Sequence, residues 1–227
     1  MNSETKIVLP IFQKTKEDIL RNANECIEKG ADILEIRIDG MENPTPELAR
    51  EIIEEINFPI IATNRIKSEG GSFEGSEEER IAILKECAEV ADYVDIELQC
   101  DEKYIKEIKD TGVTTIISYH DFEKTPDLDF LIDIVEKEAK LGDIPKIAVM
   151  PNNLEDTITV LAILSHFENV VAISMGELGS YTRVISSKFN APFTFATAND
   201  LTAPGQIDID TMRILLNSDL IETPELD

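Results

Sequence analysis

The feature that most constrains the fold of this chain is the regular return of short apolar runs rich in β-branched residues along its 227 residues. Eight such runs occur, about 28 residues apart, and each has the length of a buried strand. They lie at residues 6–10, 32–38, 59–63, 93–98, 113–118, 146–150, 170–174 and 192–196. Several are almost continuously apolar, which is typical of parallel strands that are covered on both faces.

The segments between these runs have the periodicity of amphipathic helices. In residues 48–56, for example, Leu48, Ile52 and Ile56 fall on one stripe. Residues that favour helix N-caps precede several segments: Thr15, Thr45 and Ser76. Glycines that favour left-handed C-caps follow others: Gly30, Gly112 and Gly142.

Eight strands that alternate with eight helices can form a closed barrel or an open doubly wound sheet. No GxGxxG motif follows the first run, and eight regular units favour closure. The pattern therefore predicts the α/β class and a (β/α)8 TIM barrel. No linker or change of composition divides the chain, so we expect residues 1–227 to form a single catalytic domain.

The charge of the chain limits the classes of partner that it can bind. It has 46 acidic and 21 basic residues and a formal net charge of −25. Such a chain is repelled by nucleic acid and by anionic lipid, so neither is expected as a partner. The acidity indicates either a solvated charged surface or adaptation to a salt-rich cytoplasm. No apolar stretch is long enough to span a membrane, and three cysteines without a CxxC pair fit a reducing compartment, so we expect a cytoplasmic protein.

Polar residues gather where the predicted strands end. In a barrel the carboxyl ends of the strands share one mouth, which is where the chemistry of this fold takes place. Glu35 and Arg37 alternate on the second run and therefore face the same side. They form either a ligand site or an internal layer of salt bridges. Further polar strand ends are Arg65, Glu97, His120, Asp121 and Ser174.

Lys146 begins the apolar run KIAVM after Pro145. A lysine that points into a barrel loses hydration, which favours the neutral amine needed for attack on a carbonyl. Alternatively, Lys146 only begins the strand, with its ammonium group in solvent.

His120, one of two histidines, follows a strand and can exchange protons near neutral pH, whereas His166 receives no function. There is no HExxH motif and no cysteine pair, so we expect no catalytic metal. The loop with Glu69, Gly70 and Gly71 lacks the ending of a P-loop, and its glycines allow Glu69 to fold over the mouth of the barrel. The polar segment 199–206 after the last run is either a lid or a connector.

Taken together, these motifs resemble the type I 3-dehydroquinate dehydratases, which are (β/α)8 Schiff-base lyases of the shikimate pathway. The similarity covers nearly the whole chain in order. The motifs that carry it are EIRID at residues 35–39, Arg65 followed by EGG at 69–71, SYHDF at 118–122, KIAVMP at 146–151, SMG at 174–176 with Arg183, and APGQ at 203–206.

The resemblance implies a role for each matching residue. Lys146 corresponds to the lysine that condenses with the substrate ketone, and His120 to the general acid and base. Glu69 corresponds to the acid that orients this histidine. The implied substrate contacts are Glu35, Arg37, Arg65, Met175, Arg183, Phe195, Thr202 and Gln206. Thr202 replaces a common serine, and Asn199 stands where bacterial members often have lysine.

The resemblance also implies 3-dehydroquinate as substrate, no cofactor and a homodimer. Two other functions stay open at this point. One is a class I aldolase, although the stretch MGELG at 175–179 offers no obvious phosphate site. The other is an inactive barrel that serves as a binding scaffold.

Overall fold

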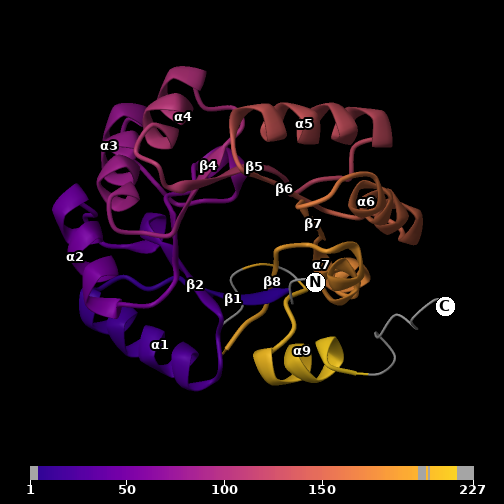
Figure 1. Cartoon of the computed structure of the whole chain (residues 1–227), viewed down its shortest axis with the longest axis horizontal. Coiled ribbons are helices and arrows are strands. Elements are labelled where there is room, and N and C mark those ends of the chain that lie inside the picture. The colour runs from indigo at the N-terminus through magenta and orange to yellow at the C-terminus, as the bar shows by residue number, and fades with distance from the viewer. Residues whose placement is uncertain (1–4, 199–202, 204, 219–227) are drawn as a thin grey trace.

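The computed structural model describes residues 5–198, 203 and 205–218. Within this part of the chain, eight parallel strands alternate with helices (Figure 1). The strands are β1 Lys6–Ile11, β2 Ile33–Arg37, β3 Ile60–Thr63, β4 Tyr93–Glu97, β5 Thr114–Asp121, β6 Ile144–Val149, β7 Val171–Ser174 and β8 Phe193–Phe195.

Helices cover the outside of the strands. The α-helices are α1 Lys16–Glu28, α2 Pro46–Ile56, α3 Glu77–Ala88, α4 Glu102–Lys109, α5 Leu128–Leu141, α6 Leu154–His166, α7 Gly176–Gly179, α8 Thr182–Ile185 and α9 Ile209–Leu216. The 3₁₀ helices are η1 Ile38–Gly40, η2 Lys67–Glu69 and η3 Ser186–Phe189. Among the described residues, no helix is both long and apolar enough to cross a membrane.

The strands pair in the order β7-β6-β5-β4-β3-β2-β1-β8. All strand pairs are parallel. Because the last strand, β8, pairs with the first, β1, the sheet curls into a nearly closed barrel, with β7 and β8 at its two edges. This confirms the prediction of a TIM barrel and excludes the open doubly wound sheet. The carboxyl ends of the strands therefore lie around one mouth.

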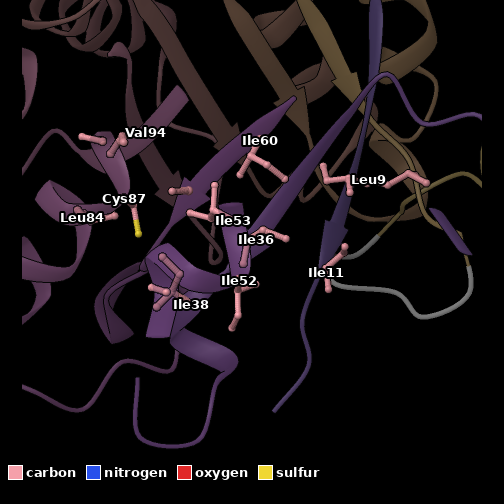
Figure 2. Close-up of a cluster of buried hydrophobic side chains, with 14 of the residues drawn as sticks. Leu9, Ile11, Ile36, Ile38, Ile52, Ile53, Ile60, Leu84, Cys87 and Val94 are labelled. Atoms are coloured by element: carbon pink, nitrogen blue, oxygen red, sulfur yellow. The ribbon is translucent and has the colours of Figure 1, made fainter. Parts of the chain in front are cut away.

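The core has layers inside and outside the strands. Side chains such as Val8, Ile61 and Phe193 fill the barrel interior. The opposite faces of the strands pack against the helices, as Figure 2 shows for Ile36, Ile52 and their neighbours. Because strands such as β1 and β3 are buried on both faces, their sequences are nearly continuously apolar.

The N-caps are confirmed. Thr15, Thr45 and Ser76 accept hydrogen bonds from the first turns of α1, α2 and α3, and Ser76 forms a capping box with Glu79. Cys26 and Cys87 are buried, free thiols.

The C-cap prediction is confirmed at two glycines and wrong at the third. Gly30 and Gly112 have positive φ angles of 87° and 91°. Gly142 instead is extended, with φ −134° and ψ −166°. A Cβ atom at Gly142 would lie 2.4 Å from Ile117 Cγ1, so the glycine there permits close packing against β5.

Two other predictions need correction. The sixth strand begins at Ile144, not at Lys146, because Pro145 pairs with Ile117 inside the sheet. Lys146 is therefore an interior residue of the strand. A single helix was expected between the last two strands, but α7, α8 and η3 take its place. Gly179 belongs to this break, since a Cβ atom there would lie 2.2 Å from the carbonyl oxygen of Ser174.

Candidate active site

A pocket of about 100 Å³ lies at the mouth of the barrel. The residues that line it are Glu35, Arg37, Arg65, Glu69, Gly70, His120, Phe122, Lys146, Ala148, Ile173, Met175, Arg183, Phe195, Ala203 and Gln206. Ten of the eleven site residues predicted from the sequence are among them. The remaining one, Thr202, lies outside the described residues.

Lys146 points into this pocket from β6 and is only 4% exposed. Its Nζ donates a hydrogen bond to Asp95 Oδ2 at 2.8 Å and lies 3.8 Å from Glu35 Oε1. The Phe195 ring centroid is 4.5 Å from the same nitrogen. The alternative in which Lys146 only begins a strand in solvent is therefore wrong. Lys146 is therefore buried, as expected for a lysine that points into the barrel, and two carboxylates lie beside its amine.

Asp95 lies at the centre of a buried group of charges. It accepts a hydrogen bond from Ser118 Oγ at 2.7 Å and forms an ion pair with Arg65 at 2.8 Å. Burial opposes ionisation of Asp95, but the charges of Arg65 and Lys146 outweigh it and hold its pKa well below the usual range. Asp95 is therefore ionised at neutral pH.

Arg65 belongs to the wall of the pocket. Besides Asp95, it bonds Glu97 at 2.9 Å and Ser118 at 2.7 Å. Burial lowers the pKa of Arg65, but Asp95 and Glu97 outweigh that effect and the pKa is raised. Glu35 accepts a hydrogen bond from Thr63 at 2.8 Å. The sequence left a ligand site and an internal salt-bridge layer as alternatives for Glu35 and Arg37. Both residues form ion pairs, with Lys146 and Asp39 respectively, and both line the pocket, so a ligand contact stays a prediction.

His120 and Glu69 form a coupled pair. Glu69 Oε2 lies 2.9 Å from His120 Nδ1 and accepts the backbone N–H of His120 at 3.0 Å. Burial, aided by the charges of Arg65 and Lys146, holds the pKa of His120 well below 6.5. Burial raises the pKa of Glu69 to about 7. His120 is therefore uncharged at neutral pH, and its bond to Glu69 fixes the orientation of the ring.

The loop that carries Glu69 is shaped by its glycines. Gly70 has a φ of 77°, which favours glycine, and a Cβ atom there would lie 2.4 Å from the ring of Phe122. That ring stacks on the imidazole of His120 at an interplanar angle of 15°. Gly70 thus lets the Phe122 ring cover the histidine.

The opposite side of the pocket has one cation and several apolar side chains. Arg183 on α8 is 2% exposed, and burial lowers its pKa to about 10, so it keeps its charge at neutral pH. Met175 and Phe195 are buried beside it, and Gln206 accepts the backbone N–H of Ala203 at 3.3 Å. Arg183 therefore places a buried positive charge at the pocket of an otherwise acidic chain.

Asp95 is the site residue that the sequence reasoning missed. The run 93–98 was identified as a strand, and Asp95 alternates with Glu97 as Glu35 does with Arg37. The same period-two argument would have placed both carboxylates inside the barrel. Among the described residues, no group of three or more His, Cys, Asp or Glu side chains could hold a metal ion.

A larger cavity of about 540 Å³ lies beside α2 and α3, lined by residues such as Met41, Pro44 and Phe73. Its lining contains no lysine, arginine or histidine. It therefore offers neither a nucleophilic amine nor an imidazole, and the candidate active site is the smaller pocket.

The fold and the pocket define a class: a (β/α)8-barrel enzyme with a buried amine and an imidazole at the carboxyl ends of its strands. The comparisons narrow this class. The model of the type I 3-dehydroquinase family matches residues 7–223. The 3-dehydroquinate dehydratase of Methanobrevibacter smithii is 67% identical over 97% of this chain and 98% of its own. That of Methanothermobacter thermautotrophicus is 51% identical, over 93% and 96%.

Solved structures agree. The type I 3-dehydroquinate dehydratase of Clostridium difficile has a TM-score of 0.89 at 30% identity, covering 95% of this chain and 92% of that one. The chain belongs to the type I 3-dehydroquinase family, and its activity is that of a 3-dehydroquinate dehydratase, an enzyme of the shikimate pathway. This excludes both other functions considered from the sequence, the class I aldolase and the inactive scaffold.

Proposed function

We propose that this chain dehydrates 3-dehydroquinate through an imine formed on Lys146. The observation that carries the proposal is a buried amine that shares a small pocket with a neutral imidazole. An imine is useful here because its protonated form withdraws electrons from the neighbouring carbon. The proton on that carbon becomes acidic, and the hydroxyl group one carbon further on can leave.

The proposed reaction begins with formation of the imine. The neutral amine of Lys146 attacks the ketone carbon, and the resulting carbinolamine loses water to give the protonated imine. His120 assists the proton transfers of imine formation. It then removes a proton from the carbon next to the imine carbon. It returns a proton to the leaving hydroxyl group, which departs as water. Hydrolysis of the conjugated imine releases the product and regenerates Lys146.

The carboxylates around Lys146 suit this sequence. In the protonated imine, Nζ carries a positive charge. Asp95, at 2.8 Å from Nζ, stabilises this cation in a water-poor pocket. The neutral His120 in the same pocket can act as the proton acceptor during attack.

Glu69 is proposed as the orienting acid. Its contact with Nδ1 leaves Nε2 of His120 as the reactive nitrogen. Arg183 is proposed to hold the substrate carboxylate, since its guanidinium can donate two parallel hydrogen bonds. Met175 and Phe195 would pack on the ring.

The remaining proposed contacts are those carried over from the resemblance. Arg37 and Glu35 are proposed to bind ring hydroxyls, with Arg65 as the charged wall behind them. Gln206 is proposed as a lid contact, and so is Thr202, which lies outside the described residues.

Reduction with borohydride in the presence of 3-dehydroquinate tests the proposal. Borohydride should reduce the imine and inactivate the wild-type enzyme. Lys146→Ala should have no turnover and no substrate-dependent labelling, whereas Lys140→Ala, a change on the exposed side of α5, should behave like wild type. In His120→Ala the imine should still form, slowly, while elimination stalls. Labelling of Lys146→Ala at the wild-type level would refute the proposal.

We further propose that residues 1–227 act as one catalytic domain in the cytoplasm and as a homodimer. The outer face of α6 supports the dimer. Leu154 and Ile158 are 61% and 58% exposed, and no charged residue occurs between positions 157 and 165. Leu178 and Tyr181 extend this face, and Tyr181 bonds Thr157 at 2.7 Å.

A chain with a net charge of −25 repels its own copies, so association favours an uncharged surface of this kind. Sedimentation should give twice the chain mass for wild type and the single-chain mass for Ile158→Glu. A monomeric wild type would refute the dimer, and a dimeric Ile158→Glu would refute this face as its interface.

A further inference from the structure

Asp39 has no role in the chemistry described above, although it belongs to the EIRID motif. It lies in η1, directly after β2, and its side chain is completely buried. It borders the large outer cavity rather than the catalytic pocket, so it does not touch the substrate. Its contacts nevertheless lead to two parts of the site.

The first contact is with Arg37. Asp39 Oδ1 accepts Arg37 Nε at 2.8 Å, and Oδ2 accepts Nη2 of the same guanidinium at 2.7 Å. This bidentate pair fixes the plane of the guanidinium as well as its position. The rotamer that Arg37 presents to the pocket is thus set from behind by Asp39.

The second contact is with the loop that carries Glu69. Asp39 Oδ1 also accepts the backbone N–H of Arg65 at 3.3 Å, and Oδ2 accepts that of Ser72 at 3.0 Å. These two residues lie on either side of Glu69 in the chain. One carboxylate therefore holds both ends of the loop together.

Four backbone hydrogen bonds also lie within residues 65–73, donated by Glu69, Gly70, Gly71 and Phe73. The bond that joins the two ends of the loop, from Phe73 N to the carbonyl oxygen of Arg65, is the longest of them at 3.4 Å. Gly71 N donates to the carbonyl oxygen of Ile66 at 2.9 Å, and Ile66 pairs with Phe73 in an isolated bridge. A Cβ atom at Gly71 would lie 2.0 Å from the carbonyl oxygen of Arg65, so the chain returns on itself very closely. Displacement of either end would move Glu69 away from His120.

We propose that Asp39 is a positioning residue that aligns Arg37 toward the substrate and, through the 65–72 loop, Glu69 toward His120. The inference rests on the roles proposed above for Arg37 and Glu69. When the buried side chain of Asp39 is changed, Arg37 on β2 and Glu69 on η2 should therefore lose their alignment together.

Asp39→Asn is the informative variant, because it keeps the shape of the side chain. A carboxamide has one acceptor oxygen, and its nitrogen donates. The variant side chain therefore cannot accept two hydrogen bonds from Arg37 and also one each from the backbone N–H groups of Arg65 and Ser72. We expect KM to rise and kcat to fall, each by about tenfold or more, since small misplacements of reacting groups cost up to about 10²-fold.

Two double variants separate the contributions. In an Arg37→Ala background the contact with the guanidinium is already lost, so Asp39→Asn should still lower kcat but no longer raise KM. In a Glu69→Gln background, Asp39→Asn should still raise KM, but it should lower kcat by a smaller factor than it does in the wild type. Asp39→Glu keeps both acceptors and should recover part of the activity.

Asp143→Asn is the matched control. Asp143 also accepts two hydrogen bonds, from Thr115 N and Oγ1 at 2.9 and 2.7 Å, but before β6, at the other end of the barrel. Asp143→Asn should leave KM unchanged. It should also leave kcat unchanged when the active sites are counted by borohydride labelling.

The possible failures are distinguishable. If Arg37→Ala and Glu69→Gln impair the enzyme as expected but Asp39→Asn leaves both kinetic constants at the wild-type level, the positioning role is refuted. If Asp39→Asn only lowers the melting temperature, with normal kinetics per labelled site, Asp39 is merely structural and the proposal also fails. If the two single variants themselves have normal kinetics, the fault lies with the proposed function.

Discussion

Asp95 Oδ2 on β4 and Lys146 Nζ on β6 lie 2.8 Å apart, and both side chains are almost completely buried. The two strands are separated by β5 in the sheet, so the contact crosses the interior of the barrel. It joins the amine proposed as nucleophile to a carboxylate that stays ionised. The pair therefore sets the electrostatics of the whole site.

Asp95→Asn tests the importance of this pair. The variant keeps the size of the side chain but removes the negative charge that stabilises the cationic imine. We expect kcat to fall by about 10²-fold, the magnitude typical for removal of one preorganised stabilising group. Steady-state kinetics measure the effect, and circular dichroism checks that the variant is folded. Unchanged kcat in a folded Asp95→Asn would contradict this role.

The pH profile should report the His120–Glu69 pair. The pKa of His120 lies well below 6.5, so its neutral form is available at neutral pH. The pKa of Glu69 is about 7, and ionised Glu69 accepts the Nδ1 proton and leaves Nε2 free as base. We therefore expect kcat/KM to rise with pH through an inflection near 7.

Glu69→Gln should have a lower kcat/KM and lack this inflection, while any acid limb due to His120 stays below pH 6.5. A wild-type profile that is flat through pH 7, or a Gln variant that keeps the inflection, would show that Glu69 does not control the histidine.

Arg183→Ala should act mainly on binding. Its guanidinium is buried and charged at neutral pH, and a hydrogen bond to a charged group contributes about 1.5–3 kcal/mol. We expect KM to rise by about ten- to a hundredfold, since 1.4 kcal/mol corresponds to a factor of ten, with a smaller change in kcat. Initial-rate kinetics over a wide substrate range measure both constants. A change confined to kcat would assign Arg183 to the chemical step.

Much of this site could be predicted from the sequence because its residue types are rare or placed in distinctive motifs. Lys146, His120 and Glu69 lie in the KIAVMP, SYHDF and EGG motifs, and each reaches the pocket. The strands were found because burial on both faces leaves a clear apolar signature.

The rest depended on three-dimensional contacts. In a chain with 46 acidic residues, a buried aspartate cannot be told from a solvated one by composition, which is why Asp95 was missed. Gly142 looked like a C-cap, but its close contact with Ile117 comes from a strand distant in sequence.

Glu138 gives a prediction about stability. It is fully buried in α5, and neither carboxylate oxygen makes a hydrogen bond of good geometry. Burial raises its pKa well above 4.5, against the opposing effect of the nearby Lys146 backbone N–H. The folded chain therefore keeps a proton that the unfolded chain loses above about pH 4.5, so this group lowers stability as pH rises through that range.

Glu138→Leu should remove this effect. We expect it to raise the free energy of unfolding at pH 8 by about 1–3 kcal/mol, the cost of an unsatisfied buried polar group. The gain should shrink toward pH 4, where both states hold the proton. Urea denaturation at the two pH values measures the difference. Equal or lower stability of Glu138→Leu at pH 8 would show that the carboxyl group is stabilising.

The most direct test of the account is to find the atom that bonds to the substrate. Wild-type enzyme is incubated with 3-dehydroquinate, reduced with borohydride, digested and mapped by mass spectrometry. We predict one added ligand-derived mass per chain, on the peptide that contains Lys146 and on that lysine alone. A label on any other lysine, or catalytic turnover without a label, would contradict the proposed chemistry.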